Sequence, residues 1–289
     1  MMNGMSIRMI DTPDEMLTLE RIGTHQYRAD NLSGPAPVIF GGQILAQVVV
    51  AASQSVPGKE LKSLHTVFAR GGSPEHPLEI DVEPLQDGRS FASLSISARQ
   101  GDRLCTQSVA LLHDPEPDLI RHATDPPAGP GPDQIPSRSG GHPWWELRVV
   151  DDVDMQDPNQ VGPPELYVWS RFSQVPAGLA ASQALLAFAS DGFLIATAMR
   201  PHPGVGQALA HVTISTSVVA QTISFHEPFD AGGWLLLAHR SPYAGRGRSY
   251  GEADVFSEDG RLVASYTQEN IIRHMPDGQA PTSGQRAKY

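Results

Sequence analysis

The chain carries one pattern of structural signals twice. In the first half, an apolar stretch of helical character over residues 40–53 precedes four segments with strand-like alternation. In the second half, an Ala- and Leu-rich helical stretch over residues 178–199 precedes four similar segments. Arg89-Ser90-Phe91 also aligns with Arg248-Ser249-Tyr250. The repeat predicts a duplicated α+β unit, in which an antiparallel sheet wraps on a single helix.

A segment rich in Pro and Gly separates the two copies, and this composition disfavours both regular helix and central strand. The last residues are polar and also contain Pro and Gly. We therefore expect an N-terminal unit over residues 1–112, a linker over 113–143, a C-terminal unit over 144–274 and a loose tail over 275–289.

Composition excludes several classes of function. The formal net charge of −11 argues against a nucleic-acid partner, because such binding relies on clustered Lys and Arg. The single cysteine, Cys105, cannot form an internal disulfide, and its apolar neighbours favour a place in the core. The 11 histidines are scattered without an H-E-x-x-H motif, so we expect neither a metal site nor a cofactor.

The location of the protein can be predicted in the same way. The N-terminus lacks the apolar core and cleavage site of a signal peptide. Residues 38–52, which we take as the most apolar stretch, are too few to span a bilayer and include Gln43 and Gln47. We expect a cytoplasmic protein without a membrane anchor.

A duplicated unit creates a seam between its copies, where ligand sites are favoured. Positions that carry a polar side chain in one copy and a small or apolar residue in the other are then candidates for a functional role. Gln268 falls opposite Ala110, since 268 − 158 = 110, and Asp191 stands in an otherwise apolar stretch. The comparable place in the first copy is predicted at Gly41-Gly42. Asp191 and Gln268 are therefore candidate functional residues.

Each candidate has two interpretations. Asp191 could cap a helix that begins after it, or act as a general base in a cleft. Gln268 could be a solvent-facing strand residue, or an amide that orients water or polarises a carbonyl. Gly41 and Gly42 could form a tight turn, or a helix start that receives an anionic ligand. His65 has a similar place in its copy to His226, which favours a structural role but leaves substrate binding open.

Residues 247–251 match G-x-S-x-G, the nucleophile motif of α/β-hydrolases. That motif requires a strand before the serine and a helix after it. The residues that follow here suit a strand and a turn, so a serine hydrolase that uses Ser249 is a minor alternative.

From about Leu19 to His274 the chain resembles the bacterial acyl-CoA thioesterase II family. The resemblance lies in FGGQILAQ (40–47), VEPLQDGRSF (82–91), FHEPF (225–229) and DGRLVASYTQENIIR (259–273), among other pieces. It implies a double-hotdog fold and hydrolysis of acyl-CoA to a fatty acid and coenzyme A, without metal or covalent intermediate. Family members use an Asp, a hydroxyl residue and a Gln. The resemblance implies that the Asp corresponds here to Asp191 and the Gln to Gln268.

The hydroxyl does not carry over directly. Counting back from Phe225-His226, its position is occupied by Val218. In a regular strand Thr216 and Thr222 share the face of Val218, whereas Ser217 points away. We take Thr216 as the candidate hydroxyl.

The missing hydroxyl keeps alternatives open. The first is a non-catalytic or weakly active acyl-CoA-binding protein. The second is a hotdog-type enoyl-CoA hydratase, which would need an Asp and a His at the central helix, but no His follows Asp191 before His202. Pairing through exposed sheet faces would also allow a homodimer or a higher oligomer.

Overall fold

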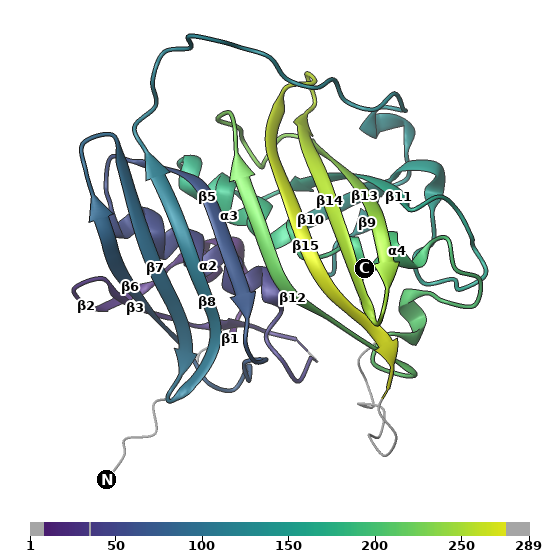
Figure 1. The fold of residues 1–289 in the computed structure, drawn as a ribbon, viewed down its shortest axis with the longest axis horizontal. Helices are drawn as coiled ribbons and strands as arrows, with labels where there is room; N and C mark the ends of the chain where they lie inside the picture. Colours follow the sequence, from purple (N-terminus) through teal and green to yellow (C-terminus); the bar gives the residue numbers. More distant parts are fainter. Residues whose placement is uncertain (1–8, 35, 276–289) are drawn as a thin grey trace.

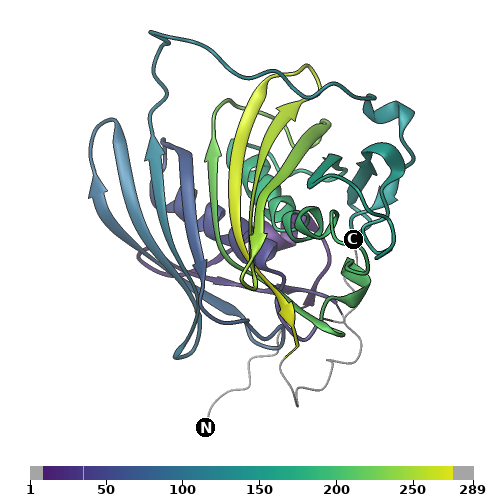
Figure 2. The same ribbon diagram turned by 45° about the vertical axis from the view of Figure 1, so that its right-hand side comes forward.

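A computed structural model describes residues 9–34 and 36–275. Their main feature is one 13-stranded sheet that curves around two central helices, α2 (Gly41–Ser55) and α3 (Leu179–Ser190) (Figures 1 and 2). All the pairings within this sheet are antiparallel, and its strand order is β2-β3-β6-β7-β8-β5-β12-β15-β14-β13-β11-β10-β9.

Each half of the sheet contains a hairpin, a central strand and a three-stranded meander. The first half consists of β2 (Glu20–Gly23), β3 (Gln26–Ala29), β5 (Glu60–Phe68), β6 (Leu78–Asp87), β7 (Phe91–Gln100) and β8 (Arg103–His113). The second half consists of β10 (Trp145–Val149), β11 (Glu165–Phe172), β12 (Ile214–Phe225), β13 (Leu235–Gly245), β14 (Arg248–Ser257) and β15 (Leu262–His274). The same order in both halves agrees with the duplication that the sequence predicts.

Short elements lie outside these two sets. They are β1 (Met9–Ile10), α1 (Pro13–Leu17), β4 (Asn31–Leu32), β9 (Arg138–Ser139), α4 (Leu194–Met199) and the 3-10 turns Pro132–Gln134, Val150–Asp152 and Gln207–Leu209. The hairpin β2–β3 was absent from the prediction, although the repeat itself could have suggested it, because two strands were predicted at the start of the second copy.

The halves meet where β5 pairs with β12, in the middle of the sheet. Both central strands carry a register shift, between Leu61 and Ser63 in β5 and between Val218 and Ala220 in β12. Aligning the ends of the strands, Phe68 with Phe225, gives an offset of 225 − 68 = 157 and places the two shifts at equivalent positions. The duplication therefore extends to the irregularities of the strands.

Helix α2 is buried on nearly all sides, because it lies between the sheet and α3. Its two glutamines are paired with the segment before it: Gln47 Nε2 donates to Asp30 O over 2.8 Å and Gln43 Nε2 donates to Asn31 Oδ1 over 2.9 Å. These bonds remove the cost of burying two amides in the core. They also fix the chain that leads into the helix.

Leu179–Met199 is apolar and long enough to span a membrane by length and composition, whereas residues 38–52, which we expected to be the most apolar stretch, are too few to pass the same test. However, 78% of the most apolar window of this segment is buried inside the protein. The segment is also not one helix: α3 ends at Ser190 and α4 begins at Leu194, with Asp191 between them. Its hydropathy is that of a core helix.

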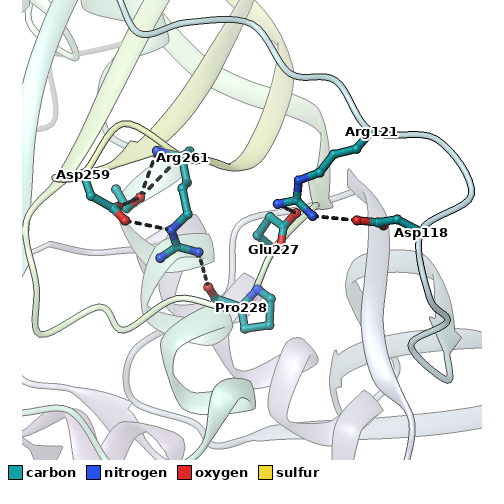
Figure 3. A network of polar contacts seen from close by, with 7 residues as sticks. Asp118, Arg121, Glu227, Pro228, Asp259 and Arg261 are labelled. Atoms are coloured by element: carbon teal, nitrogen blue, oxygen red, sulfur yellow. Dashed lines mark hydrogen bonds and ion pairs between the residues drawn. The ribbon is translucent and has the colours of Figure 1, made fainter.

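Residue 113 of the predicted linker still belongs to β8, and the rest passes along one end of the sheet, seen at the top of Figure 1, and forms only a 3-10 turn and the two-residue strand β9. Its Arg121 donates to Asp118 over 2.7 Å and to Glu227 over 2.9 Å (Figure 3). Nearby, Arg261 bonds Asp259 and the carbonyl of Pro228. Of these exposed contacts only the pair Arg121–Glu227 joins the linker to the second copy, and a pair of this kind adds little stability. Of the predicted tail, only residue 275 lies within the described residues.

Phe188 should be a major determinant of stability. Its ring is fully buried in α3 and lies 5.0, 5.3 and 5.5 Å from the rings of Phe40, Trp145 and Trp144. We expect Phe188→Ala to lower the free energy of unfolding by about 3–5 kcal/mol, measured by urea denaturation. Phe91→Ala, which removes a ring that is 50% exposed on the outer face, is the control and should cost far less. Equal losses in the two variants would contradict this view of the core.

Candidate active site

A cavity of about 620 Å³ lies where the two copies meet at one end of the helices. The first copy contributes the start of α2, including Gly41, and Arg70 just after β5. The second copy contributes Asp191 after α3 and residues 216–219 at the start of β12. The cavity is thus built from both units, as expected for a seam between duplicated copies.

Asp191 joins the two helices. Its backbone ends α3, and its Oδ2 accepts a hydrogen bond of 3.0 Å from the backbone N–H of Gly42 in the first turn of α2. It does not cap the helix that follows, because α4 has Phe193 at its N-cap. Protein atoms surround the carboxylate closely, and this burial raises its pKa to about 7, although the bond from Gly42 acts in the opposite direction.

The two glycines allow this contact. A Cβ at residue 42 would lie 2.2 Å from the carbonyl oxygen of Phe188, and one at residue 41 would lie 2.7 Å from Asp191 Oδ2. The N–H of Gly42 is therefore used by Asp191 and is not free for a ligand, contrary to the substrate-binding role predicted for it. Gly41 lines the cavity, and its N–H has no partner among residues 9–34 and 36–275. The equivalence predicted between Asp191 and Gly41-Gly42 is wrong, because Asp191 follows its helix whereas the glycines begin theirs.

Gln268 lies beside Asp191 in the core. Its Nε2 is 3.4 Å from Asp191 Oδ1 and donates to Gln221 Oε1 over 2.8 Å. Gln221 Nε2 in turn donates to Ser190 Oγ, and Ser190 Oγ donates to Ala187 O over 2.8 Å. Gln268 is only 1% exposed, which excludes the solvent-facing interpretation. The structure therefore brings Asp191 and Gln268 together, as the asymmetry between the copies suggested.

Tyr266 forms the far side of this cluster. The buried His239 gives its Nδ1 proton to Leu166 O over 2.8 Å, and burial lowers its pKa to about 4, so it is neutral. Its Nε2 must then accept the hydrogen bond from Tyr266 Oη over 2.6 Å. Burial, with a contribution from Asp191, raises the pKa of Tyr266 well above its usual value. A neutral phenol and a neutral imidazole thus lie behind the carboxylate.

The strand β12 is irregular where the hydroxyl was sought. The register shift at Val219 keeps Thr216 and Val218 on the inner face, opposite Ile272 and Asn270, but moves Thr222 to the outer face, opposite His65. The prediction that Thr222 shares the face of Val218 was therefore wrong. Thr216 is buried and lines the cavity, with its Oγ1 3.5 Å from His211 Nε2.

His65 does not reach the site. Its side chain is exposed on the outer face of the sheet and bonds Thr222 over 2.8 Å, so the structure contradicts its predicted role in substrate binding. Its equivalence to His226 also fails, because His226 follows Phe225 whereas His65 precedes Phe68 by three residues. The histidines that line the cavity, His142 and His211, come from loops that the sequence did not single out.

Ser249 lies inside strand β14, paired with Ala244 and Asn270, and is 1% exposed. This is not the strand–turn–helix geometry of a nucleophile elbow. Its hydroxyl accepts a bond of 3.3 Å from Asn270, so the alternative based on Ser249 loses its structural support. Among the described residues, no group of three or more His, Cys, Asp or Glu side chains could hold a metal ion.

The equivalent position in the first copy is apolar. Gln221 pairs with Gln268, and the matching pair across β5 and β8 is Leu64 with Ala110. A second, more open hollow of about 800 Å³ lies at the start of α3, beside Gly178 and Asp230. The polar cluster thus belongs to one of the two equivalent places.

Comparison with known proteins agrees with this architecture. A solved protein of unknown function with hot dog fold from Alicyclobacillus acidocaldarius superposes with a TM-score of 0.73 over 90% of this chain and 97% of its own, at 20% identity. This chain therefore has the hotdog fold. An acyl-CoA thioesterase II from Mycobacterium marinum gives a TM-score of 0.79 at 28% identity, over 92% of this chain and 99% of its own.

Sequence comparison identifies the family. The profile of the acyl-CoA thioesterase N-terminal domain matches residues 29–113, and that of the C-terminal domain matches residues 121–272. Acyl-CoA thioesterase 2 of Haemophilus influenzae is 28% identical over 277 residues, which cover 89% of this chain and 96% of its own. The chain belongs to the acyl-CoA thioesterase family.

The raised pKa of Asp191 should make stability depend on pH. Between about pH 4 and pH 7 the folded protein keeps a proton on Asp191 that the unfolded chain releases, so stability should fall as the pH rises through this range. We expect the wild type to lose about 2–3 kcal/mol between pH 5 and pH 8 relative to Asp191→Asn, measured by urea unfolding. The asparagine keeps an oxygen that can accept from Gly42 but does not titrate. Parallel pH curves for the two proteins would show that Asp191 has an ordinary pKa.

Proposed function

We propose that this protein hydrolyses acyl-CoA thioesters to a free fatty acid and coenzyme A, by direct attack of water. The observation that carries the proposal is the contact between Asp191 and Gln268 at a cavity between the copies, in a chain of the acyl-CoA thioesterase family. The relatives from Haemophilus influenzae and Mycobacterium marinum carry names of that activity.

We also propose that the fold is a double hotdog, in which each unit is a sheet wrapped on its own central helix. The repeated strand order, the two helices and the equivalent register shifts in β5 and β12 support this assignment. In this arrangement one chain forms the seam that separate hotdog subunits would otherwise form by pairing.

Asp191 serves as the general base. Burial raises its pKa to about 7, with no ion pair to a described residue to oppose it, so the carboxylate is basic enough to take a proton from water yet largely ionised just above neutral pH. Gln268 holds the water beside it. The leaving group is a thiolate, which reduces the need for a strong general acid. Hydrolysis should therefore weaken as the pH falls below about 7.

The start of α2 stabilises the oxyanion. Gly41 lines the cavity, and its N–H, which no described residue accepts, belongs to the first turn of a 15-residue helix, where the helix dipole favours negative charge. Arg70 lines the same cavity and can meet the phosphates of coenzyme A, although the protein as a whole is acidic. Apolar side chains that include Ile39, Ile44 and Ile195 provide a surface for the acyl chain.

Thr216 supplies the hydroxyl that Val218 lacks. It lies on the same inner face of β12 as Val218, two residues closer to the start of the strand, and it lines the cavity. The alternative is a protein that binds acyl-CoA with little or no turnover. That alternative is favoured by the presence of Val218 where the family has Ser or Thr.

Replacing Gln268 tests its role in hydrolysis. We expect Gln268→Ala to reduce thiol release from acyl-CoAs by about 10²–10³-fold, because a positioned amide beside the base is lost. Asp191→Ala should be impaired at least as strongly. Gln107→Ala, on the equivalent strand β8 of the other copy, is the matched control and should keep near wild-type activity.

Acyl-CoAs of several chain lengths should be tested, with binding measured alongside turnover. Tight binding without thiol release by the wild type would support the binding protein instead. Full activity of Gln268→Ala would refute the assignment of Gln268. Hydration of an enoyl-CoA without thiol release would point to the hydratase, for which His142 and His211 line the same cavity.

A further inference from the structure

We propose that Ser190 and Gln221 are positioning residues that fix the orientation of the Gln268 amide, so that its N–H faces Asp191 and its carbonyl oxygen is left to accept a hydrogen bond from the attacking water. In its kinetic part this inference rests on the proposed function. It assigns a role to two side chains that neither line the cavity nor belong to the family's set of Asp, hydroxyl and Gln.

The direction of the hydrogen-bond chain follows from its first member. The carbonyl of Ala187 can only accept, so Ser190 Oγ must give its single proton to it. The lone pairs of Ser190 Oγ then accept from Gln221, which must present Nε2. Gln221 Oε1 is thereby turned toward Gln268, and Gln268 must present its own Nε2 to it.

The last amide therefore has one possible orientation. Gln268 Nε2 carries two protons, of which one goes to Gln221 and the other faces Asp191 Oδ1 at 3.4 Å. Its Oε1 is buried and has no partner among the described residues. A buried acceptor without a partner is costly, and a bound water that donates to it would remove that cost. The amide is thus arranged to accept from water rather than to donate to the thioester carbonyl.

The burial of the chain makes it effective. Ser190, Gln221 and Gln268 are 0, 2 and 1% exposed, so bulk water does not compete for their hydrogen bonds. All three are neutral, and they orient Gln268 without adding charge next to Asp191. If the Gln268 amide were flipped by 180°, its carbonyl oxygen would face the carboxylate of Asp191. This contact would disfavour the ionised form of Asp191 that the reaction needs.

The other titratable groups around Asp191 are few. Tyr266 lies behind it on β15, and Arg70, His142 and His211 line the cavity in front of it. Substitution of Ser190 or Gln221 changes none of them. A shift in the titration of Asp191 in such variants would therefore report on the amide.

Two variants break the chain at different places. Ser190→Ala removes the hydroxyl, and Gln221→Met removes the amide while keeping a side chain of similar length. For each we expect kcat to fall about three- to tenfold, as for the loss of one hydrogen bond, with KM unchanged. The double variant should lose little more than either single one, because both act through the same chain.

The acid limb of the pH–kcat profile gives the specific readout. It should move to higher pH in Ser190→Ala and in Gln221→Met, since the N–H of Gln268 is no longer held toward Asp191. Ser182→Ala is the matched control: Ser182 is also a buried serine of α3, but it accepts from Ala231 N, away from the cavity. It should leave both kcat and the acid limb unchanged.

A titration by ¹³C NMR separates this inference from the proposed function. The Asp191 carboxyl, assigned by its loss in Asp191→Asn, should titrate at higher pH in the two variants than in the wild type or in Ser182→Ala. An inactive wild type would end the proposed function, yet this titration would still test the chain. An unchanged titration and acid limb in Ser190→Ala would overturn the inference, whether or not Gln221→Met folds.

Discussion

The hydrogen bond from Gly42 to Asp191 is the contact on which the site depends. It connects the end of the helix of the second copy to the start of the helix of the first. Glycines at 41 and 42 permit an approach so close that a Cβ at residue 42 would overlap the carbonyl of Phe188. The same contact that packs the two units together places a carboxylate at their seam, so fold and chemistry are linked at one point.

Burial has two opposite effects at that point. It surrounds the carboxylate with protein atoms and reduces its hydration, which raises its pKa and would by itself favour the protonated form. The N–H groups of Gly42 and Gln268, which face Oδ2 and Oδ1, favour the ionised form. The balance lies near neutral pH, where a carboxylate is both available and basic. A cationic partner would have lowered the pKa and weakened the base, so the lack of an ion pair between Asp191 and any described residue suits the proposed role.

Much of this arrangement could be predicted from the sequence, because alternation and duplication are regular. The repeat predicted a helix followed by four strands in each unit, although it missed the hairpin β2–β3, and its asymmetry selected Asp191 and Gln268 as candidates. Thr222 was misjudged for a physical reason. A single extra residue at Val219 exchanges the inner and outer faces for the residues that follow it. The alternation of apolar and polar residues does not reveal this bulge, because the neighbouring residues are a mixture of Val, Ala and Thr. Gln221 was missed because only hydroxyl residues were sought around Val218.

Only the second copy carries the polar cluster, because the equivalent positions of the first copy hold apolar side chains. In the first copy, Leu64 and Ala110 occupy the places of Gln221 and Gln268, so those positions pack as ordinary core. A polar chain in the core is tolerated only when its members satisfy one another. Ser190, Gln221 and Gln268 do so except at Gln268 Oε1. The first copy bears no such cost, whereas in the second the remaining unpaired atom belongs to the amide whose N–H faces the carboxylate, and a reacting water that donates to this atom would complete the chain.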